Sequence, residues 1–295
     1  MKRKYMIIVL MAGALELTGC SQGTSNSAKN GTTGSENTII SESDIAILDT
    51  EDMFTERDRD TEYDESECTA ISLSDEETKC DSDGVKMDGQ TVTITEGGTY
   101  LLTGSLSNGS VVVDTDKTEK VQLILENVSI INEEGAGICV EQADKVFITL
   151  ADGSTNKIVS NSFTGNEDTN IDGAIFSRED LTLNGSGTLK ITSAAHGIVS
   201  KDDLVLTGGV YQIQSEKQGL SGKESVRIAD GTFTITSGTD AIHSEDTDED
   251  TKGFVYITGG VLTLAAGGDG ISSSYVVQAD GGSFDISTSS TETDT

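Results

Sequence analysis

The sequence predicts an all-β protein that folds as a right-handed parallel β-helix, a solenoid with about 22 residues in each rung. After Gly84 the chain consists of short alternating strands, such as residues 91–95, that are separated by Gly, Asn and Asp, and no segment has the period of a helix. The same part of the chain carries an internal repeat. The chain has no proline, which suits strands that are paired on both sides.

The repeat is visible when three segments are aligned, namely residues 175–183, 198–206 and 220–228, which superimpose without a gap. Each is followed by a glycine turn and a second short strand. Two further copies begin at Ile242 and Ile271, and the first of these carries a seven-residue insertion rich in acidic residues. The copies therefore start 23, 22, 22 and 29 residues apart, and the last step becomes 22 without the insertion. Leucine-rich repeats have a similar length, but their leucine and asparagine signature is missing here.

Stacking of these copies would place apolar residues in columns, because equivalent positions of neighbouring rungs lie next to one another. A single rung has nothing to pack against, so the columns supply the core. Two columns are predicted, and they contain Ile175, Ile198, Leu220, Ile242 and Ile271 in one case and Leu189, Tyr211, Phe233, Leu262 and Phe284 in the other.

The N-terminal residues have the order of a lipoprotein signal peptide. Positive residues 2–4 precede a mostly apolar run, and residues 17–20 (LTGC) form a lipobox, so we expect residues 1–20 to be a signal peptide and Cys20 to be lipidated. An ordinary signal peptide or a short membrane anchor is the alternative. The prediction places the protein outside the cell, attached to the cell membrane through its lipid alone.

The remaining chain divides by composition into three parts. Residues 21–83 are rich in Ser, Thr, Asn, Asp and Glu and are predicted to be a flexible acidic tether. Residues 84–287 form the β-helix, and residues 288–295 are a polar tail. This tail is too short and polar to cap the last rung, which leaves an edge that could pair with another chain.

Charge and cysteine content exclude some classes of partner and site. With 19 basic and 51 acidic residues the net charge is −32, so nucleic acid is a poor partner, and calcium is the divalent counterion abundant outside cells. Cys68 and Cys80 could form a disulfide, although spacing alone does not decide this. The sequence contains no Cys-x-x-Cys and no paired-histidine spacing, which argues against a structural zinc site.

Residues 98–106, 143–153 and 197–209 closely resemble the secreted clostridial-type carbohydrate-binding β-helix proteins, a family with a pectate-lyase-like fold. The resemblance covers residues 84–287. It implies a parallel β-helix that binds calcium and plant-type or acidic polysaccharides. Rungs of the family usually begin with Asp-Gly-Ile. That aspartate is present as Asp172, Asp240 and Asp269 but is replaced by His196 and Gln218 in the two rungs between.

A calcium site is predicted around the insertion. Neighbouring rungs lie roughly 4.8 Å apart, so the bare carboxylates of Asp240 and Asp269 would repel each other unless a cation lay between them. The insertion adds enough oxygen ligands for calcium. The predicted metal residues are Asp172, Asp240, Asp246, Asp248, Asp250 and Asp269, supported by Glu245 and Glu249. A solvated acidic loop is the alternative.

A sugar-binding surface is predicted from a column of cations. Arg178, Lys201 and Lys223 fall on consecutive rungs, at a spacing close to the length of one sugar unit, and could bind the carboxylates of an acidic polysaccharide. Each cation is followed by an acidic residue, so a surface ladder of ion pairs is the competing interpretation. Arg227 and Tyr256 are expected on a common outward face, where the tyrosine could stack on a sugar ring.

Three hypotheses of function follow. The first is a calcium-stabilised module that binds cellulose or acidic plant or envelope glycans without catalysis, because no nucleophile with the expected spacing accompanies His196 or His243. The second is a weak calcium-dependent polysaccharide lyase, for which Arg178 or Lys201 would be the base. The third is a structural spacer without a ligand.

Overall fold

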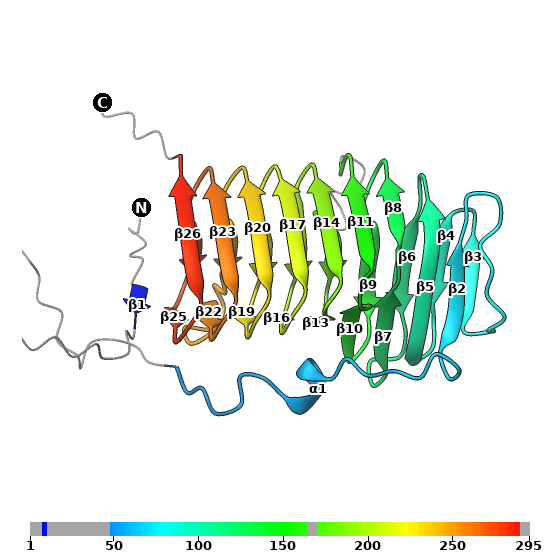
Figure 1. The fold of residues 1–295 in the computed structure, drawn as a ribbon, viewed down its shortest axis with the longest axis horizontal. Coiled ribbons are helices and arrows are strands. Elements are labelled where there is room, and N and C mark those ends of the chain that lie inside the picture. Colours follow the sequence, from blue (N-terminus) through cyan, green and yellow to red (C-terminus); the bar gives the residue numbers. More distant parts are fainter. Residues whose placement is uncertain (1–7, 11–47, 164–169, 290–295) are drawn as a thin grey trace, which may run out of the picture.

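The computed structural model describes residues 8–10, 48–163 and 170–289, and almost all of its regular structure is strand. The strands stack along one axis and form three parallel sheets that surround a common core (Figure 1). Cys20 and most of the predicted signal peptide lie outside the described residues. In the described part, no helix is long and apolar enough to cross a membrane.

Each full turn of the chain contributes one strand to each sheet. Among the described strands, the pairings within sheets A and C are parallel, and in sheet B only β3 and β4 pair antiparallel. Sheet A contains β1 (Ile8–Leu10), β2 (Thr69–Leu73), β5 (Gly98–Leu106), β7 (Lys120–Leu125), β10 (Lys145–Leu150), β13 (Asp180–Gly185), β16 (Asp203–Leu206), β19 (Ser225–Ile228), β22 (Phe254–Ile257) and β25 (Val277–Ala279).

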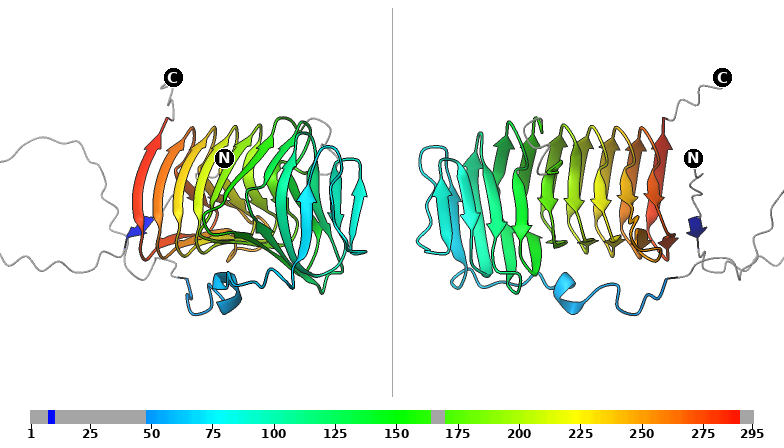
Figure 2. Two further views of the ribbon diagram at one scale, coloured as in Figure 1. Left: turned by 45° about the vertical axis from the view of Figure 1, so that its right-hand side comes forward. Right: turned by 180° about the vertical axis from the view of Figure 1, so that it is seen from behind.

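Sheet B contains β3 (Val85–Asp88), β4 (Thr91–Ile94), β6 (Ser110–Asp114), β9 (Ile138–Gln142), β12 (Gly173–Ser177), β15 (His196–Ser200), β18 (Leu220–Gly222), β21 (Ile242–Ser244) and β24 (Ile271–Ser273). Sheet C begins with the last residues of β5 and continues with β8 (Ser129–Asn132), β11 (Thr155–Ser160), β14 (Thr188–Ser193), β17 (Val210–Ser215), β20 (Thr232–Ser237), β23 (Val261–Ala266) and β26 (Ser283–Thr288). Figure 2 shows the stack from two further sides.

Strand register confirms the two predicted apolar columns. Ile175 pairs with Ile198, and the pairing continues through Leu220 and Ile242 to Ile271. The second column runs in the same way from Leu189 to Phe284. In its middle the Tyr211 and Phe233 rings are stacked with centroids 4.8 Å apart. Alternate residues of each strand point inward, so these columns fill the interior of the solenoid.

The structure corrects the predicted tether in its second half. Residues 48–68, here called the strap, lie along the outer face of sheet A and run from the C-terminal rungs towards the N-terminal ones (Figures 1 and 2). The backbone N–H of Leu48 donates to Gln278 in β25 at 3.0 Å, and Arg57 donates to Gln122 in β7 at 2.7 Å. The solenoid therefore begins before residue 84, because β2 pairs with β5 directly after the strap.

The strap stays in place because the outward column of sheet A is unusually suited to burial. This column pairs residue by residue through Gln122, Phe147, Thr182, Val205, Arg227, Tyr256 and Gln278. Phe147 and Val205 are almost fully buried there. Apolar side chains on the outer face of a sheet would be exposed to water, and the strap buries them.

Helix α1 (Glu56–Arg59) holds the centre of the strap through Asp58, which is 2% exposed. Thr182 donates to the Asp58 carboxylate at 2.7 Å, and the Lys145 ammonium lies 2.8 Å from it. Burial by itself raises the pKa of a carboxyl group, but Lys145, Thr182 and Thr55 overcome it and lower the pKa of Asp58 to about 2. Asp58 is therefore a charged anchor beneath the strap.

Two further expectations from the sequence were a disulfide between Cys68 and Cys80 and an open edge at the C-terminal rung. Cys68 and Cys80 do not form a disulfide, and the Cys68 thiol donates instead to the Asp64 carbonyl at 3.2 Å. At the C-terminal end, β1 pairs in parallel with β25. Pairing at this edge by another chain stays a prediction. The last strand, β26, ends at Thr288.

Candidate functional site

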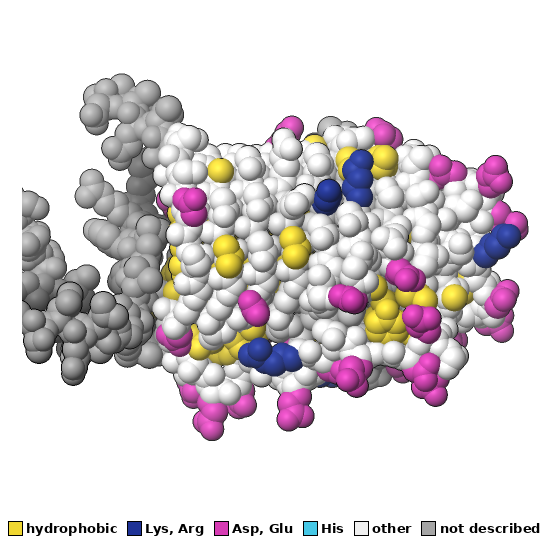
Figure 3. All heavy atoms as spheres, in the orientation of Figure 1, with side chains coloured by type: hydrophobic (Ala, Val, Ile, Leu, Met, Phe, Trp, Pro, Cys, Tyr) yellow, Lys and Arg dark blue, Asp and Glu magenta, His cyan; other side chains and the backbone are white. Residues whose placement is uncertain are grey.

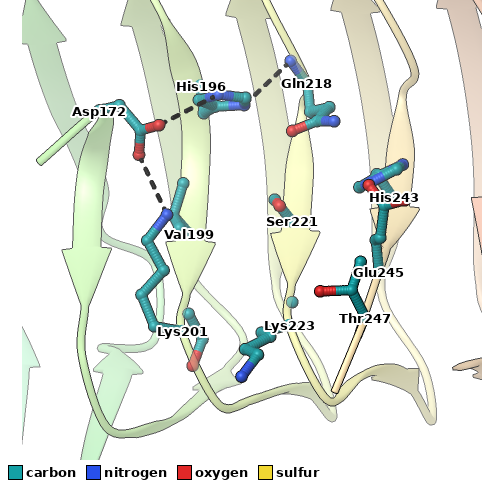
Figure 4. Close-up of a pocket in the computed structure, with 12 residues that line it drawn as sticks. Asp172, His196, Val199, Lys201, Gln218, Ser221, Lys223, His243, Glu245 and Thr247 are labelled. Carbon is teal, nitrogen blue, oxygen red and sulfur yellow. Dashed lines mark hydrogen bonds and ion pairs between the residues drawn. The ribbon is translucent and has the colours of Figure 1, made fainter. Parts of the chain in front are cut away.

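A shallow groove of about 430 Å³ crosses the outer face of sheet B over β12, β15, β18 and β21 (Figure 4). Its floor is formed by the small residues Ser221 and Gly222 together with Val199. Around this floor stand side chains with polar ends, namely Asp172, His196, Lys201, Gln218, Lys223, His243 and Glu245. The groove thus presents hydrogen-bond donors and acceptors over successive rungs, with no aromatic residue on its floor.

One side of the groove is a small network around Asp172. Its carboxylate lies 3.4 Å from Nε2 of His196 and 3.5 Å from the Lys201 ammonium. Gln218 donates its backbone N–H to Nδ1 of His196 at 3.3 Å. Burial lowers the pKa of His196 to about 4 against the opposing effect of Asp172, so the imidazole is neutral at neutral pH.

The register changes the predicted equivalence of the rung-starting residues. Gly173 pairs with His196, so Asp172 precedes the position of His196 by one residue. The cause is Ala174, which adds a residue between Gly173 and Ile175 compared with the rungs that start at Ile198 and Ile271. Asp172 therefore points sideways at His196 and Lys201 instead of continuing a column with Asp240 and Asp269.

The structure brings the predicted cation column together on sheet B. Arg178 donates to Glu141 at 2.6 Å, and both Arg178 and Lys201 lie over the Phe176 ring. Lys223 donates to Asp248 at 2.9 Å. Lys201 and Lys223 line the groove, whereas Arg178 lies beyond its edge. The cations form ion pairs, as the competing interpretation expected, and two of them also face the groove, where sugar binding stays a prediction.

The expectation that Tyr256 is exposed is wrong. Tyr256 is 5% exposed because the strap covers it, and its ring stacks on Phe54 with centroids 5.9 Å apart. Its hydroxyl donates to Asp280 at 2.9 Å. Arg227 lies beside it under the strap, paired with Asp203 and donating to the Met53 carbonyl. Neither side chain is available to a sugar in this arrangement.

Carboxylates of the acidic insertion already have partners inside and outside it. Asp246 accepts the backbone N–H groups of Asp248 and Glu249, and the first of these lowers the pKa of Asp246. Asp240 is 3.0 Å from Nδ1 of His243 and accepts the backbone N–H of Asp269 at 2.8 Å. The predicted facing pair of Asp240 and Asp269 is thus replaced by hydrogen bonds, and Asp250 takes part in no carboxylate cluster that the structure describes.

Three other carboxylates come together in the turns that lead from sheet B to sheet A. Oxygen atoms of Asp180, Asp202 and Asp203 lie within 4.8 Å of one another, the one such group among the described residues. Burial and then Asp180, Glu224 and Asp203 raise the pKa of Asp202 to about 7. Burial and Asp203 also raise the pKa of Asp180. Negative charge in this cluster exceeds what Lys145 and Arg227 neutralise.

The three carboxylates offer oxygen atoms of the kind that a hard cation takes, and Arg227 and Ser225 also contact Asp203. Burial first, and then repulsion between neighbouring carboxylates, raises the pKa of Asp202 and of Asp180. Sequence reasoning missed this carboxylate cluster, although the aligned repeats contained its signal. Asp180 and Asp203 occupy equivalent positions, because the residues that follow them, Leu181 and Leu204, are paired.

A family profile for carbohydrate-binding domain-containing proteins matches residues 88–295. A protein of that description from Acetivibrio thermocellus is 34% identical over 137 residues, which is 45% of this chain and 48% of the relative. The match thus spans about half the length of this curated relative. A solved structure, described as a polysaccharide lyase-like protein from C. thermocellum in a gadolinium derivative, has 32% identity and a TM-score of 0.67, and the match covers 77% of this chain and 98% of that one.

Proposed function

Because the chain belongs to the family of carbohydrate-binding domain-containing proteins, with a pectate-lyase-like fold, we propose that it binds a polysaccharide in the groove of sheet B. The observation that carries the proposal is the pair Lys201 and Lys223, which stand on adjacent rungs in one groove of a strongly acidic protein. Two cations at rung spacing suit the carboxylates of successive acidic sugars. The neutral imidazole of His196 and the amide of Gln218 suit hydroxyl groups.

The proposal also includes the cellular location of the protein. Lipidation of Cys20 would attach the chain to the outer side of the cell membrane, and residues 21–47 would separate the lipid from the strap. Right-handed coiling with about 22 residues per rung is part of the same proposal, since nearly all crossovers between parallel strands are right-handed. The groove would then face glycans that surround the cell.

Calcium is proposed as a stabilising ion, held by Asp180, Asp202 and Asp203. The ion would supply positive charge where these carboxylates repel one another. This cluster lies in the turns that follow β12 and β15, the strands beneath the groove, so neutralising it would fix the positions of Lys201 and its neighbours. The ion's role in the proposal is structural, and sugar binding falls to the groove residues.

Replacing Lys201 and Lys223 together with alanine is expected to weaken binding of soluble polygalacturonate about tenfold, because each charge-assisted contact contributes about 1 kcal/mol or less at an exposed site. Calorimetric titration of the full chain measures the change. The full chain is needed because a fragment that starts at residue 84 would lack the strap and β2.

The matched control is Lys117→Ala with Lys157→Ala, which removes two positive charges at exposed positions outside the groove. Binding should then stay within about twofold. Equal weakening by the control would mean that overall charge, and not the groove, attracts the polymer. Absence of binding to any glycan would contradict the proposed function itself. Release of unsaturated sugar ends would replace it with a lyase activity.

A further inference from the structure

The outer face of sheet C carries little charge for so acidic a protein. Its outward residues on β11, β14, β17, β20, β23 and β26 are mainly Thr, Ser, Gln and Val. Among the outward residues of these six strands, Asp285 is the one acid, and Lys157 and Lys190 are the two bases. Figure 3 shows this face, with few acidic side chains over its centre and more towards the end and lower edge. Because each chain has a net charge of −32, two copies would repel each other least through such a face.

The three charged residues lie in one column. Strand register places the middle column of the face along Lys157, Lys190, Gln212, Thr234, Thr263 and Asp285. The two bases therefore lie on β11 and β14, and the acid lies on β26 at the opposite end of the six strands. None of the three makes a side-chain hydrogen bond or an ion pair with another residue in the described part of the chain.

The columns on either side of the charges are nearly neutral and made of small or β-branched residues. One contains Thr155, Thr188, Val210, Thr232, Val261 and Ser283, and the other contains Val159, Thr192, Gln214, Thr236, Ala265 and Ser287. Val261 is 50% exposed. Faces of this kind pack closely when two sheets meet, because no long side chain holds them apart.

The order of the charges makes the face complementary to itself. Identical chains pair most often about a twofold axis, so that one patch meets the same patch of the second copy. An axis parallel to the strands, placed between β17 and β20, reverses the direction of the second solenoid and sets β11 against its β26. Lys157 then lies opposite Asp285 of the second copy, and this contact occurs twice in the pair. An axis along the solenoid would instead set each charge against itself.

We propose that the outer face of sheet C is the interface of a symmetric dimer, in which two copies of this chain pack face to face with their solenoids in opposite directions. Strands roughly 4.8 Å apart and residues that rise roughly 3.3 Å give a buried area of about 1,000 Å² in total, at the lower limit for a specific interface. Association is therefore weak, with a Kd on the order of 0.1 mM. The inference goes beyond the proposed function, because the groove lies on sheet B and stays open in the pair.

Sedimentation velocity of the full chain, at concentrations up to about 0.5 mM and at about 0.15 M salt, measures the association. Asp285→Lys sets a lysine against Lys157 of the second copy and should raise the Kd about tenfold. This variant also makes the chain less negative, so overall repulsion cannot explain a weaker dimer. Lys157→Asp should weaken association in the same way, and Lys117→Asp is the control with the same change of charge at an exposed position outside this face. Thermal unfolding checks that all variants remain folded.

Mixing the two single variants tests the arrangement itself. In a mixed pair, Lys157 of the Asp285→Lys chain meets Asp285 of the Lys157→Asp chain, and the two introduced residues meet each other. The mixture should therefore form dimers with about the wild-type Kd, although neither variant does so alone. The double variant Lys157→Asp/Asp285→Lys exchanges the charges within one chain and should also recover the wild-type Kd.

Three results would overturn the inference. The first is a wild-type chain that stays monomeric over the whole range of concentration. The second is a dimer that Asp285→Lys leaves unchanged or that Lys117→Asp weakens equally, because association would then use another surface or overall charge. The third is a mixture that associates no better than its two components. Polygalacturonate binding plays no part in these measurements, so this inference and the proposed function can each fail without the other.

Discussion

Replacing Asp58 with alanine is expected to lower the free energy of unfolding by about 3 kcal/mol, because the change leaves the buried end of Lys145 without its partner. Thr182 and Thr55 also lose the carboxylate to which their hydroxyls donate. Since α1 is held at this point, the strap should separate from sheet A, exposing Phe147 and Val205. Urea unfolding and hydrogen exchange of sheet A measure the two effects.

The contribution of Asp58 also depends on pH, with a definite sign. Its pKa is about 2 in the folded chain, below the ordinary value of 3.8. The charged form is therefore favoured by folding. The stabilisation, about 2 kcal/mol, is complete above the ordinary pKa and is lost as the pH falls from about 4 to about 2. The variant should lack this part of the acid sensitivity.

Asp52 provides the control, since it is an exposed acid in the same strap. Asp52→Ala should change the free energy of unfolding by less than about 0.5 kcal/mol. Asp58→Asn keeps the shape without the charge and should be destabilised by an intermediate amount. Equal stability of the Asp58→Ala and Asp52→Ala variants would refute the anchoring role.

The second large effect concerns Asp202 and the proposed calcium ion. In the metal-free protein the pKa of Asp202 is raised from 3.8 to about 7, so folding disfavours the charged form. Stability should fall as the pH rises from about 4 to about 7, by about 2 kcal/mol after allowance for partial solvent screening. Added calcium should remove this loss, because it favours the charged form. Thermal unfolding with calcium and with chelator, at pH 5 and pH 8, measures both.

Asp202→Asn separates the two contributions. The variant should be more stable than the wild type at pH 8 in chelator, and it should gain much less from calcium. Asp250→Asn is the matched control, because it removes an exposed acid from the insertion that the sequence favoured as the metal site. If calcium stabilises Asp202→Asn as it does the wild type but no longer stabilises Asp250→Asn, the ion binds at the insertion and not at Asp202.

The sequence predicted those features that repeat. The columns through Ile198 and Tyr211 follow from the spacing of the copies, because register in a solenoid converts sequence period directly into contact. The strap was not predictable in that way, since it has no period and its contacts join residues such as Asp58 and Thr182 that lie 124 positions apart. The apolar outward residues Phe147 and Val205 were its signal.

The candidate site residues that repeat from rung to rung were likewise predictable, and those that depend on loop geometry were not. Lys201 and Lys223 were predicted because three consecutive rungs carry a cation at the same position. The acidic insertion attracted the metal prediction through its density of carboxylates, yet its hydrogen bonds depend on loop geometry that composition does not contain. The cluster at Asp202 forms across rungs from acids that are unremarkable in each single copy.

The strap has a consequence for how such a chain can change in length. Solenoids commonly gain or lose whole repeats, because each contacts only its neighbours. Here one segment contacts β25 through Leu48, β13 through Asp58 and β7 through Arg57, at fixed intervals along its own length. A duplicated or deleted rung would move these contact points apart or together by one strand spacing. The length of the strap therefore matches one number of rungs. Only variants that change the strap and the number of rungs together would keep the face of sheet A covered.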